Sequence, residues 1–440
     1  MKNILVLGAG LVAKPLVRYL LDHPDFKVTV ASRTVSKAVN LIDEHPDGKA
    51  LPLNVIDEAE LEKLVFSHDL TISLVPYTHH VKIAKMCIKH KKNMVTTSYV
   101  SKPMAELDQA AKDAGILILN EIGLDPGIDH MSAMRIIDDV KSKGGKIVSF
   151  RSYCGGLPAP EANDNPFGYK FSWSPRGVVM AGSNNGRYLQ ESKEVFVPGK
   201  ELFTHYHHRE IEGVGELEAY PNRDSVPYID TYGIQNAETM YRGTFRNIGW
   251  CDTLKAIADL GYLSEEEKPD AKGKTYGEFT AMLVGGESEN VKEATAEFLN
   301  ISPDSDVIER LEWLGLFSIT PLSESSNCAL DFLADIMLEK MPYREGERDM
   351  IVLFHDFIAQ HSDGKKQNIT STLVDFGIPG GDSSMSRTVS LPAAVATKLI
   401  LEGKISLKGV HIPNVPEVYN PTLDELETMN IKCVEEYKPL

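Results

Sequence analysis

Along the first 120 residues, short apolar runs alternate with segments whose hydrophobic residues recur at helical spacing. The runs are too short for helices and predict strands at 3–8, 27–32, 50–55, 70–75, 93–98 and 116–120. The segments between them have the spacing of amphipathic helices, as in "LVAKPLVRYLLDH", "EAELEKLVFS" and "HHVKIAKMCIKH". Repeated strand–helix units with strands apolar on both faces predict a doubly wound α/β domain, in which helices cover both sides of a parallel sheet.

This rhythm changes after residue 125. "KIVSFRSYCGG" predicts a strand, and an Asp363–Gly364 turn between "DMIVLFHDFIAQHS" and "KKQNITSTLVDFG" predicts a hairpin. We therefore expect a second α+β domain with a mixed or antiparallel sheet, for substrate binding and dimerisation, at 126–250 and 320–385. The charged, helical stretch 251–320 predicts a small helical insertion. The C-terminal helical patterns predict that about 385–440 returns to the first domain, 1–125.

The totals exclude several classes of protein. The 440 residues are 42% hydrophobic and 25% charged, as in an ordinary globular protein, and the net charge of −17 argues against nucleic acid or anionic membranes as partners. Five widely spaced cysteines without a Cys-x-x-Cys pair predict neither a disulfide framework nor a metal site. No apolar run reaches the length of a membrane span, and the first residues enter a strand rather than a signal peptide, so we expect a cytoplasmic protein.

The loop after the first strand, "LGAGLVA", has the Gly-x-Gly-x-x-Ala form of a dinucleotide-binding turn. Gly8 permits the tight turn, Gly10 lets a pyrophosphate approach the backbone, and Ala13 allows close packing of helix on sheet. An ordinary strand-ending turn is the alternative. The context of a strand before the loop and a helix after it favours a Rossmann domain, with Ala9, Leu11 and Val12 also lining the cofactor.

The end of the second strand indicates which dinucleotide binds. An acid there would favour NAD, whereas this chain has Ser32, Arg33 and Thr34, which suit a 2′-phosphate. The sequence therefore favours NADP and leaves NAD possible, since Arg33 could instead be a solvated residue at the start of a helix.

Three further loops end strands of the same predicted sheet. They are "SLVPYTHH" (73–80), "TTSYVS" (96–101) and "NEIGLDPGIDHM" (120–131). Ligands of open α/β sheets bind beyond the carboxyl ends of the strands, so these hydroxyls and acids are expected to line the nicotinamide pocket.

Together with "SYCGGLPAPE", "NPFGYKFSWSPRG", "YPNRDS" and "RGTFR", these motifs resemble the saccharopine dehydrogenase (L-glutamate-forming) family, in order and over nearly the whole chain. The resemblance implies reversible hydride transfer between NADP(H) and saccharopine, by way of the imine of 2-aminoadipate 6-semialdehyde with L-glutamate. It places the chain in lysine biosynthesis or lysine degradation. Saccharopine carries three carboxylates, whose planar recognition calls for arginine.

Carried over residue by residue, the resemblance gives two sets of contacts. Those expected to bind substrate are Ser98, Tyr99, Asp125, Arg223, Thr244, Phe245 and Arg246. Those expected to bind cofactor, besides the glycine loop and the residues after the second strand, are Asn54, Val55, Leu74, Val75, Trp173 and Ser174.

The proton transfers of imine chemistry need titratable groups. Asp125 is expected to stabilise the cationic imine and to move protons, with Tyr99 as its hydrogen-bond partner. Cys154 is a third catalytic candidate, and a buried structural thiol is an equal alternative for it. His130 is expected to cap or pack the following helix.

Two alternative functions remain open. One is a related reductive condensation with another amine, of the carboxynorspermidine dehydrogenase type; the other is a catalytically inactive nucleotide-binding sensor or scaffold. The exposed sheet expected in the second domain favours a homodimer.

Overall fold

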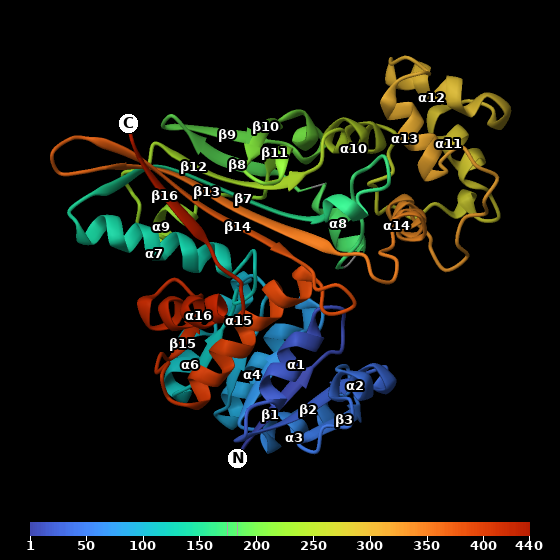
Figure 1. Cartoon of the computed structure of the whole chain (residues 1–440). Coiled ribbons are helices and arrows are strands. Elements are labelled where there is room, and N and C mark those ends of the chain that lie inside the picture. The colour runs from blue at the N-terminus through green and yellow to red at the C-terminus, as the bar shows by residue number, and fades with distance from the viewer. Residues whose placement is uncertain (174, 183) are drawn as a thin grey trace. The chain divides into compact units, whose positions relative to one another are not determined.

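The chain folds into two compact units. The computed structural model describes residues 1–173, 175–182 and 184–440. Unit 1 comprises residues 1–146 and 359–440, and unit 2 comprises residues 147–358 (Figure 1). These units follow the density of contacts, and the predicted domain boundaries at residues 125, 250, 320 and 385 remain predictions.

Unit 1 contains a seven-stranded sheet in the order β15-β6-β5-β4-β1-β2-β3, with every neighbouring pair parallel. The four residues Ile4–Leu7 of β1 are fully buried, because helices cover both faces of the strand. The strands are β1 (Lys2–Leu7), β2 (Phe26–Ser32), β3 (Gly48–Pro52), β4 (Leu70–Ser73), β5 (Asn93–Val95), β6 (Leu117–Leu119) and β15 (Gly409–His411).

The predicted doubly wound fold is confirmed, with β3, β4, β5 and β6 shorter than expected. β5 ends at Val95 although the predicted strand continues to Ser98: the Thr96 N–H still donates to the carbonyl of Leu119 on β6 at 2.9 Å, and pairing in register stops there. The helices of unit 1 are α1 (Ala13–Leu21), α2 (Val35–Ile42), α3 (Glu58–Ser67), α4 (His80–His90), α5 (Lys102–Ala105), α6 (Asp108–Ala114), α7 (Ile128–Ser142), α15 (Ser384–Leu401) and α16 (Pro416–Thr428).

The C-terminal segment joins the same unit. α15 packs against α1, and β15 extends the parallel sheet beside β6. A buried ion pair fastens α15, with Arg387 Nη1 2.9 Å from Asp375 Oδ1, while Arg387 Nη2 donates to the carbonyl of Met429. Burial raises the pKa of Asp375 against the opposing effect of Arg387 and Ser384.

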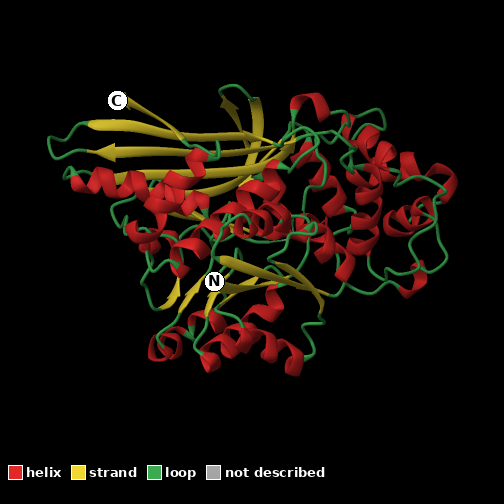
Figure 2. Ribbon diagram, turned by 60° about the horizontal axis from the view of Figure 1, so that its bottom comes forward, coloured by secondary structure: helices red, strands yellow, loops and turns green. Residues whose placement is uncertain are grey.

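The second sheet is mixed, as predicted, and has the strand order β10-β11-β12-β7-β13-β14-β16, with β8 pairing β12 and β9. β7 and β12 are parallel, whereas β10–β11, β11–β12 and β14–β16 are antiparallel. The predicted hairpin is present at residues 361–365, where His361 and Lys365 close the turn. The long strands of this second sheet are drawn in yellow in Figure 2. The strands are β7 (Lys146–Pro158), β8 (Gly186–Gln190), β9 (Lys193–Val197), β10 (His207–Ile211), β11 (Gly215–Pro221), β12 (Thr239–Arg246), β13 (Asp349–Gln360), β14 (Lys366–Phe376) and β16 (Val434–Pro439).

Unit 2 also contains the helices that the charged, periodic stretch predicted. Their apolar faces form one core around Trp250, Phe279 and Leu333. α11 begins with a capping box, because the Thr275 side chain and Glu278 satisfy each other's backbone N–H groups. The helices are α8 (Pro175–Ala181), α9 (Tyr228–Thr231), α10 (Trp250–Asp259), α11 (Tyr276–Val284), α12 (Val291–Leu299), α13 (Asp306–Leu314) and α14 (Ala329–Lys340).

Two further observations concern the chemistry the chain can hold. All five cysteines are free. Across the described parts of the chain, no cluster of three or more His, Cys, Asp and Glu residues is arranged to hold a metal ion, and no helix is both long and apolar enough to cross a membrane.

Candidate active site

The glycine loop lies between β1 and α1, directly beside the end of β4. Gly8 has φ +109°, and a Cβ there would lie 2.9 Å from the carbonyl oxygen of Leu74. The Leu74 N–H donates to the carbonyl of Leu7 at 2.9 Å, so the two loops are held edge to edge. The structure thus brings together two of the predicted cofactor segments, the glycine loop and Leu74–Val75.

Gly10 meets a different environment from Gly8. A Cβ at Gly10 would have no atom of the protein within 4 Å, so the space over this backbone is open to a ligand. α1 starts at the fully buried Ala13, and Val12 at its N-cap offers no side chain to the first N–H groups. The positive end of the helix dipole at this start, which no side chain caps, favours an anion and fits the pyrophosphate of a dinucleotide.

The residues after β2 fit a 2′-phosphate. Arg33 and Thr34 are exposed, and Ser32 Oγ accepts the N–H of Thr34 at 3.3 Å. Within the residues described, the Arg33 guanidinium has no hydrogen-bond or ion-pair partner, so it is available to a ligand.

Asn54 and Val55 serve the turn that precedes α3. Asn54 Oδ1 accepts the N–H of Ile56 at 3.2 Å, and the Val55 carbonyl accepts from Lys82 Nζ at 2.9 Å. These contacts fix the loop after β3, and the predicted cofactor role of both residues remains a prediction.

The acids after β6 form a buried network. Glu121 uses one carboxylate oxygen to accept the N–H of Val100 and the other to bond His130 Nε2, both at 2.8 Å. Asp129 accepts the N–H of Gly127, whose missing Cβ would overlap the backbone of Gly123. His130 is fully buried, as the predicted packing role requires. The acid-rich loop is therefore held rigid by its own charges.

The predicted catalytic pair joins this loop, which carries Asp125, to the loop after β5, which carries Tyr99. Tyr99 Oη donates to Asp125 Oδ1 at 3.0 Å, and both residues are half-buried. The Asp125 carboxylate accepts the hydrogen bond of the Tyr99 hydroxyl, and part of the Asp125 side chain remains exposed to a ligand. Their catalytic roles remain predictions.

Beside this pair lies a histidine that the sequence analysis did not single out. His80 is 4% exposed; its Nδ1 lies 2.8 Å from Ser73 Oγ and its Nε2 lies 2.9 Å from Ser98 Oγ. Burial, aided by His79, lowers its pKa to about 4. Because His80 ends the polar segment "PYTHH", the sequence gives it the pattern of a surface residue. Only its position at the start of an amphipathic helix could have indicated that it is buried.

In unit 2, Arg246 is a buried cation with few protein partners. It is 5% exposed, its Nη1 donates to the carbonyl of Phe245 at 2.7 Å, and its guanidinium lies over Tyr169 and Trp250, 4.9 and 5.3 Å from the ring centres. Its Nε and the Trp250 Nε1 are buried without hydrogen-bond partners among the described residues. A buried guanidinium with unused donors suits an anionic ligand.

The acid opposite Arg246 is already occupied. Glu218 faces Arg246 in the β11–β12 register, yet its two carboxylate oxygens accept the N–H groups of Gly249 and Cys251, each at 2.7 Å. These N–H groups stand at the start of α10, where the helix dipole stabilises negative charge. Glu218 is therefore committed to the helix, and it makes no ion pair with Arg246.

The remaining predicted residues of unit 2 differ in exposure. Phe245 is fully buried and stacks on Tyr153 with ring centres 5.0 Å apart, so its side chain belongs to the core and only its backbone could reach a ligand. Cys154 is 9% exposed and pairs in register with the half-buried Thr244. Arg223 is exposed, with φ +57°. Trp173 packs on the helical core, and Ser174 lies outside the described residues.

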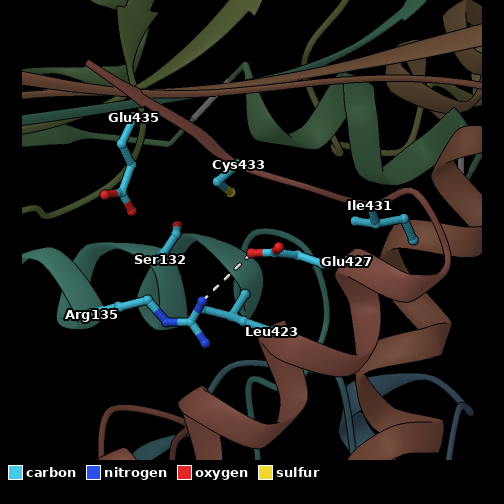
Figure 3. Close-up of a pocket in the computed structure, with 7 residues that line it drawn as sticks. All are labelled: Ser132, Arg135, Leu423, Glu427, Ile431, Cys433 and Glu435. Atoms are coloured by element: carbon cyan, nitrogen blue, oxygen red, sulfur yellow. Dashed lines mark ion pairs between the residues drawn. The ribbon is translucent and has the colours of Figure 1, made fainter.

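A hollow elsewhere in unit 1 contains none of the predicted site residues. It has a cavity volume of only about 20 Å³, is partly open to solvent, and is lined by Ser132, Arg135, Leu423, Glu427, Ile431, Cys433 and Glu435 (Figure 3). Its cation is compensated, because Arg135 lies 2.7 Å from Asp424 and 3.7 Å from Glu427. Burial raises the pKa of Cys433 to about 11, so the thiol is a poor nucleophile.

Three features define a dinucleotide-binding protein of the Rossmann class. The first strand of a parallel sheet ends in a glycine loop, the space over Gly10 is open, and the Arg33 guanidinium after β2 is available to a ligand. Residues 4–119 match the saccharopine dehydrogenase NADP-binding domain, and residues 123–431 match the saccharopine dehydrogenase C-terminal domain. The chain belongs to the saccharopine dehydrogenase family. This confirms the predicted family and the preference for NADP.

Individual relatives match over the whole chain. The saccharopine dehydrogenase [NADP(+), L-glutamate-forming] of Schizosaccharomyces pombe is 44% identical, covering 99% of both chains. The mitochondrial alpha-aminoadipic semialdehyde synthase of Bos taurus is 39% identical over 98% of this chain but only 47% of its own length. The solved apo saccharopine dehydrogenase (L-Glu forming) of Saccharomyces cerevisiae superposes with a TM-score of 0.91 at 40% identity, covering 99% of this chain and 100% of that one.

The two loop glycines predict opposite effects of the same substitution. Gly8→Ala is expected to destabilise the fold by roughly 1–3 kcal/mol, because the new Cβ meets Leu74 O at a positive φ. Gly10→Ala is expected to leave the melting temperature unchanged and to weaken NADPH binding about tenfold or more, since its Cβ points into ligand space. Thermal unfolding and NADPH fluorescence titration measure the two effects. A Gly10→Ala protein that melts early but binds NADPH normally would contradict the assignment.

His80 predicts a pH effect of defined sign. Its folded pKa of about 4 lies below the ordinary 6.5, so the unfolded chain binds the proton first as the pH falls. The stability that neutral His80 provides is complete above pH 6.5 and is lost between pH 6.5 and 4, by about 3 kcal/mol in total. NMR titration of histidine-labelled protein, with the His80 signal assigned by its loss in His80→Gln, should show no protonation at pH 5.5. A midpoint near 6.5 would refute the effect of burial.

Proposed function

We propose that this chain is an NADP-dependent saccharopine dehydrogenase that forms L-glutamate. The observation that carries the proposal is the 44% identity over 99% of the chain to a relative of that name. In the oxidative direction, saccharopine loses a hydride from the carbon of its secondary amine to NADP⁺, and the resulting imine is hydrolysed to L-glutamate and 2-aminoadipate 6-semialdehyde. Reduction of the imine by NADPH is the reverse reaction, and both belong to lysine metabolism.

The charges of unit 2 support an anionic substrate. Arg246 is buried, retains unused donors, and has no carboxylate of its own, because Glu218 is committed to α10. A substrate carboxylate would supply the missing counter-charge. We assign Arg223 and the backbone of Thr244 and Phe245 to the same task on the basis of the family pattern.

The pair in unit 1 supports the imine step. Asp125 accepts a hydrogen bond from Tyr99, which holds the carboxyl group in place. An ionised carboxylate beside a cationic imine stabilises the charge that develops when hydride leaves. We therefore keep Asp125 and Tyr99 as the proposed catalytic residues. Cys154, buried on β7, is the weaker candidate, and a structural role fits its burial equally well.

We also propose a cytoplasmic homodimer that binds neither nucleic acid nor membranes. The five free cysteines fit a reducing compartment, and the net charge of −17 disfavours polyanionic partners. β16 is exposed along its length at the end of the second sheet, where a second copy could dock.

The activity is tested directly. Purified protein given saccharopine and NADP⁺ at alkaline pH should generate the absorbance of reduced nicotinamide, and the same mixture without saccharopine should not. The residues after β2 predict that this absorbance rises faster with NADP⁺ than with NAD⁺. If the absorbance does not increase with either cofactor, the chain is not a saccharopine dehydrogenase, and the result would favour a catalytically inactive nucleotide-binding protein.

Coenzyme choice is expected to depend on Arg33. Arg33→Ala should raise the KM for NADP⁺ by roughly 10- to 100-fold, because the variant loses the free energy of a hydrogen bond to a charged phosphate. The kinetics with NAD⁺ should not change. Lys27→Ala is the matched control, since Lys27 is an exposed cation at the other end of β2. An unchanged NADP⁺/NAD⁺ ratio in Arg33→Ala would refute the 2′-phosphate role.

Substrate affinity is expected to depend on Arg246. Arg246→Lys keeps the positive charge but loses the planar guanidinium group that can form two parallel hydrogen bonds. The transition state should therefore lose about 2–3 kcal/mol of stabilisation, measured as a lower kcat/KM for saccharopine. The KM for NADP⁺ should not change. Arg209→Lys is the control, because Arg209 also lies over an aromatic ring, Phe354, but is paired with Asp356 at 2.7 Å. Equal losses in both variants would point to general damage.

A further inference from the structure

A polar cluster links the ends of β4 and β5 in unit 1. His80, the first residue of α4, bridges Ser73 at the end of β4 and Ser98 in the loop after β5. Thr96 completes the cluster, with its Oγ1 3.4 Å from His80 Nε2. Ser73, His80 and Thr96 are buried, whereas Ser98 is half-buried and keeps surface for a ligand.

The hydroxyl groups of this cluster determine which imidazole nitrogen carries the hydrogen. Thr96 donates its single hydroxyl hydrogen to the carbonyl of Ser73 at 2.9 Å, so it can offer His80 Nε2 only a lone pair. Ser73 is fully buried, and among the described residues its hydroxyl hydrogen has no acceptor other than His80 Nδ1. An unsatisfied buried donor is costly, so Nδ1 accepts and Nε2 bears the hydrogen.

This tautomer fixes the direction of the Ser98 hydroxyl. Because His80 Nε2–H donates to Ser98 Oγ, the hydroxyl hydrogen of Ser98 points away from the cluster. No acceptor for it exists among the described residues of the chain. The imidazole is neutral because burial lowers its pKa to about 4, so the arrangement persists at physiological pH. Hydrogen bonds in such a series also strengthen one another.

We propose that His80 is a positioning residue that holds the Ser98 hydroxyl as a hydrogen-bond donor to a carboxylate oxygen of the substrate. The inference rests on the proposed function for the identity of that ligand. Ser98 adjoins Tyr99, whose hydroxyl bonds Asp125, and its carbonyl accepts the N–H of Glu121 at 3.1 Å, so its backbone is fixed beside the proposed catalytic pair. A hydroxyl that donates from the residue before Tyr99 gives a substrate carboxylate a partner close to the proposed catalytic pair.

Kinetics of single and double variants test this role. Ser98→Ala should raise the KM for saccharopine about tenfold or more, as expected for a lost hydrogen bond to a charged group. His80→Leu should raise it by a similar factor, and the double variant should show no further increase, because His80 acts through Ser98. His80→Gln, which retains a side-chain N–H donor, should recover part of the affinity. The KM for NADP⁺ should not change in any variant.

The matched control is His68, a second buried histidine of unit 1. Its Nε2 bonds Thr29 Oγ1 at 2.9 Å, and its Nδ1 contacts the carbonyl of Leu64. Burial lowers its pKa as it does for His80. His68→Leu should reduce stability while the KM for saccharopine stays unchanged. Multiplicative effects of His80→Leu and Ser98→Ala, or a rise in the KM for NADP⁺ instead, would overturn the proposal.

A measurement without substrate keeps this inference distinct from the proposed function. The ¹⁵N chemical shifts of histidine-labelled protein distinguish the two tautomers, and His80 should have a protonated Nε2 and an unprotonated Nδ1 at pH 7. A protonated Nδ1 would overturn the proposal even in an active enzyme. If the wild-type chain fails to oxidise saccharopine, the proposed function and the carboxylate ligand both fall, while the direction of the hydrogen bonds is decided by the tautomer.

Discussion

The parallel pairing of β1 with β4 is the constraint on which the site in unit 1 depends. It sets Leu7 beside Ser73, so the two strands end at the same level and their loops leave the sheet together. The missing side chain of Gly8 lets the first loop approach Leu74, and Ser73 carries the hydrogen bond that orients His80. The loops expected to bind cofactor and substrate thus depend on one register. A shift of one residue would turn Ser73 to the other face of the sheet and separate them.

The two units treat buried charge in opposite ways. In unit 1 the carboxylate of Glu121, in the loop after β6, is satisfied internally by the backbone N–H of Val100 and by His130, so it stabilises the loop. In unit 2 the acid Glu218 is satisfied by the start of α10, which leaves the nearby cation Arg246 without a counter-charge. Charges that are paired build the scaffold, whereas the one left with spare donors marks where an anion is expected to bind.

The sequence was informative where local chemistry decides the structure. Apolar periodicity predicted the parallel sheet, and the spacing of Gly8, Gly10 and Ala13 predicted a turn that is present. Phe245 shows where a motif misleads, because alternate residues of a strand face opposite sides. That periodicity sets Phe245 apart from Thr244 and Arg246 on β12, and it could have indicated a core position for the ring.

Other features had no local signal. Glu218 receives its hydrogen bonds from residues 31 and 33 positions further along the chain, and His80 obtains its role from Ser98 on a neighbouring strand end. Such contacts arise from tertiary packing, which the composition and spacing of a single segment do not encode.

The contact between Arg246 and Trp250 also gives the molecule an optical property. The indole lies against the guanidinium, and Trp250 is one of only three tryptophans in the chain. Indole emission responds to the electric field across the ring, so an anion that neutralises the neighbouring cation would change the colour and intensity of the emitted light. If an anion binds at Arg246 as proposed, its binding would be detectable in the protein's own fluorescence, without a label and without turnover.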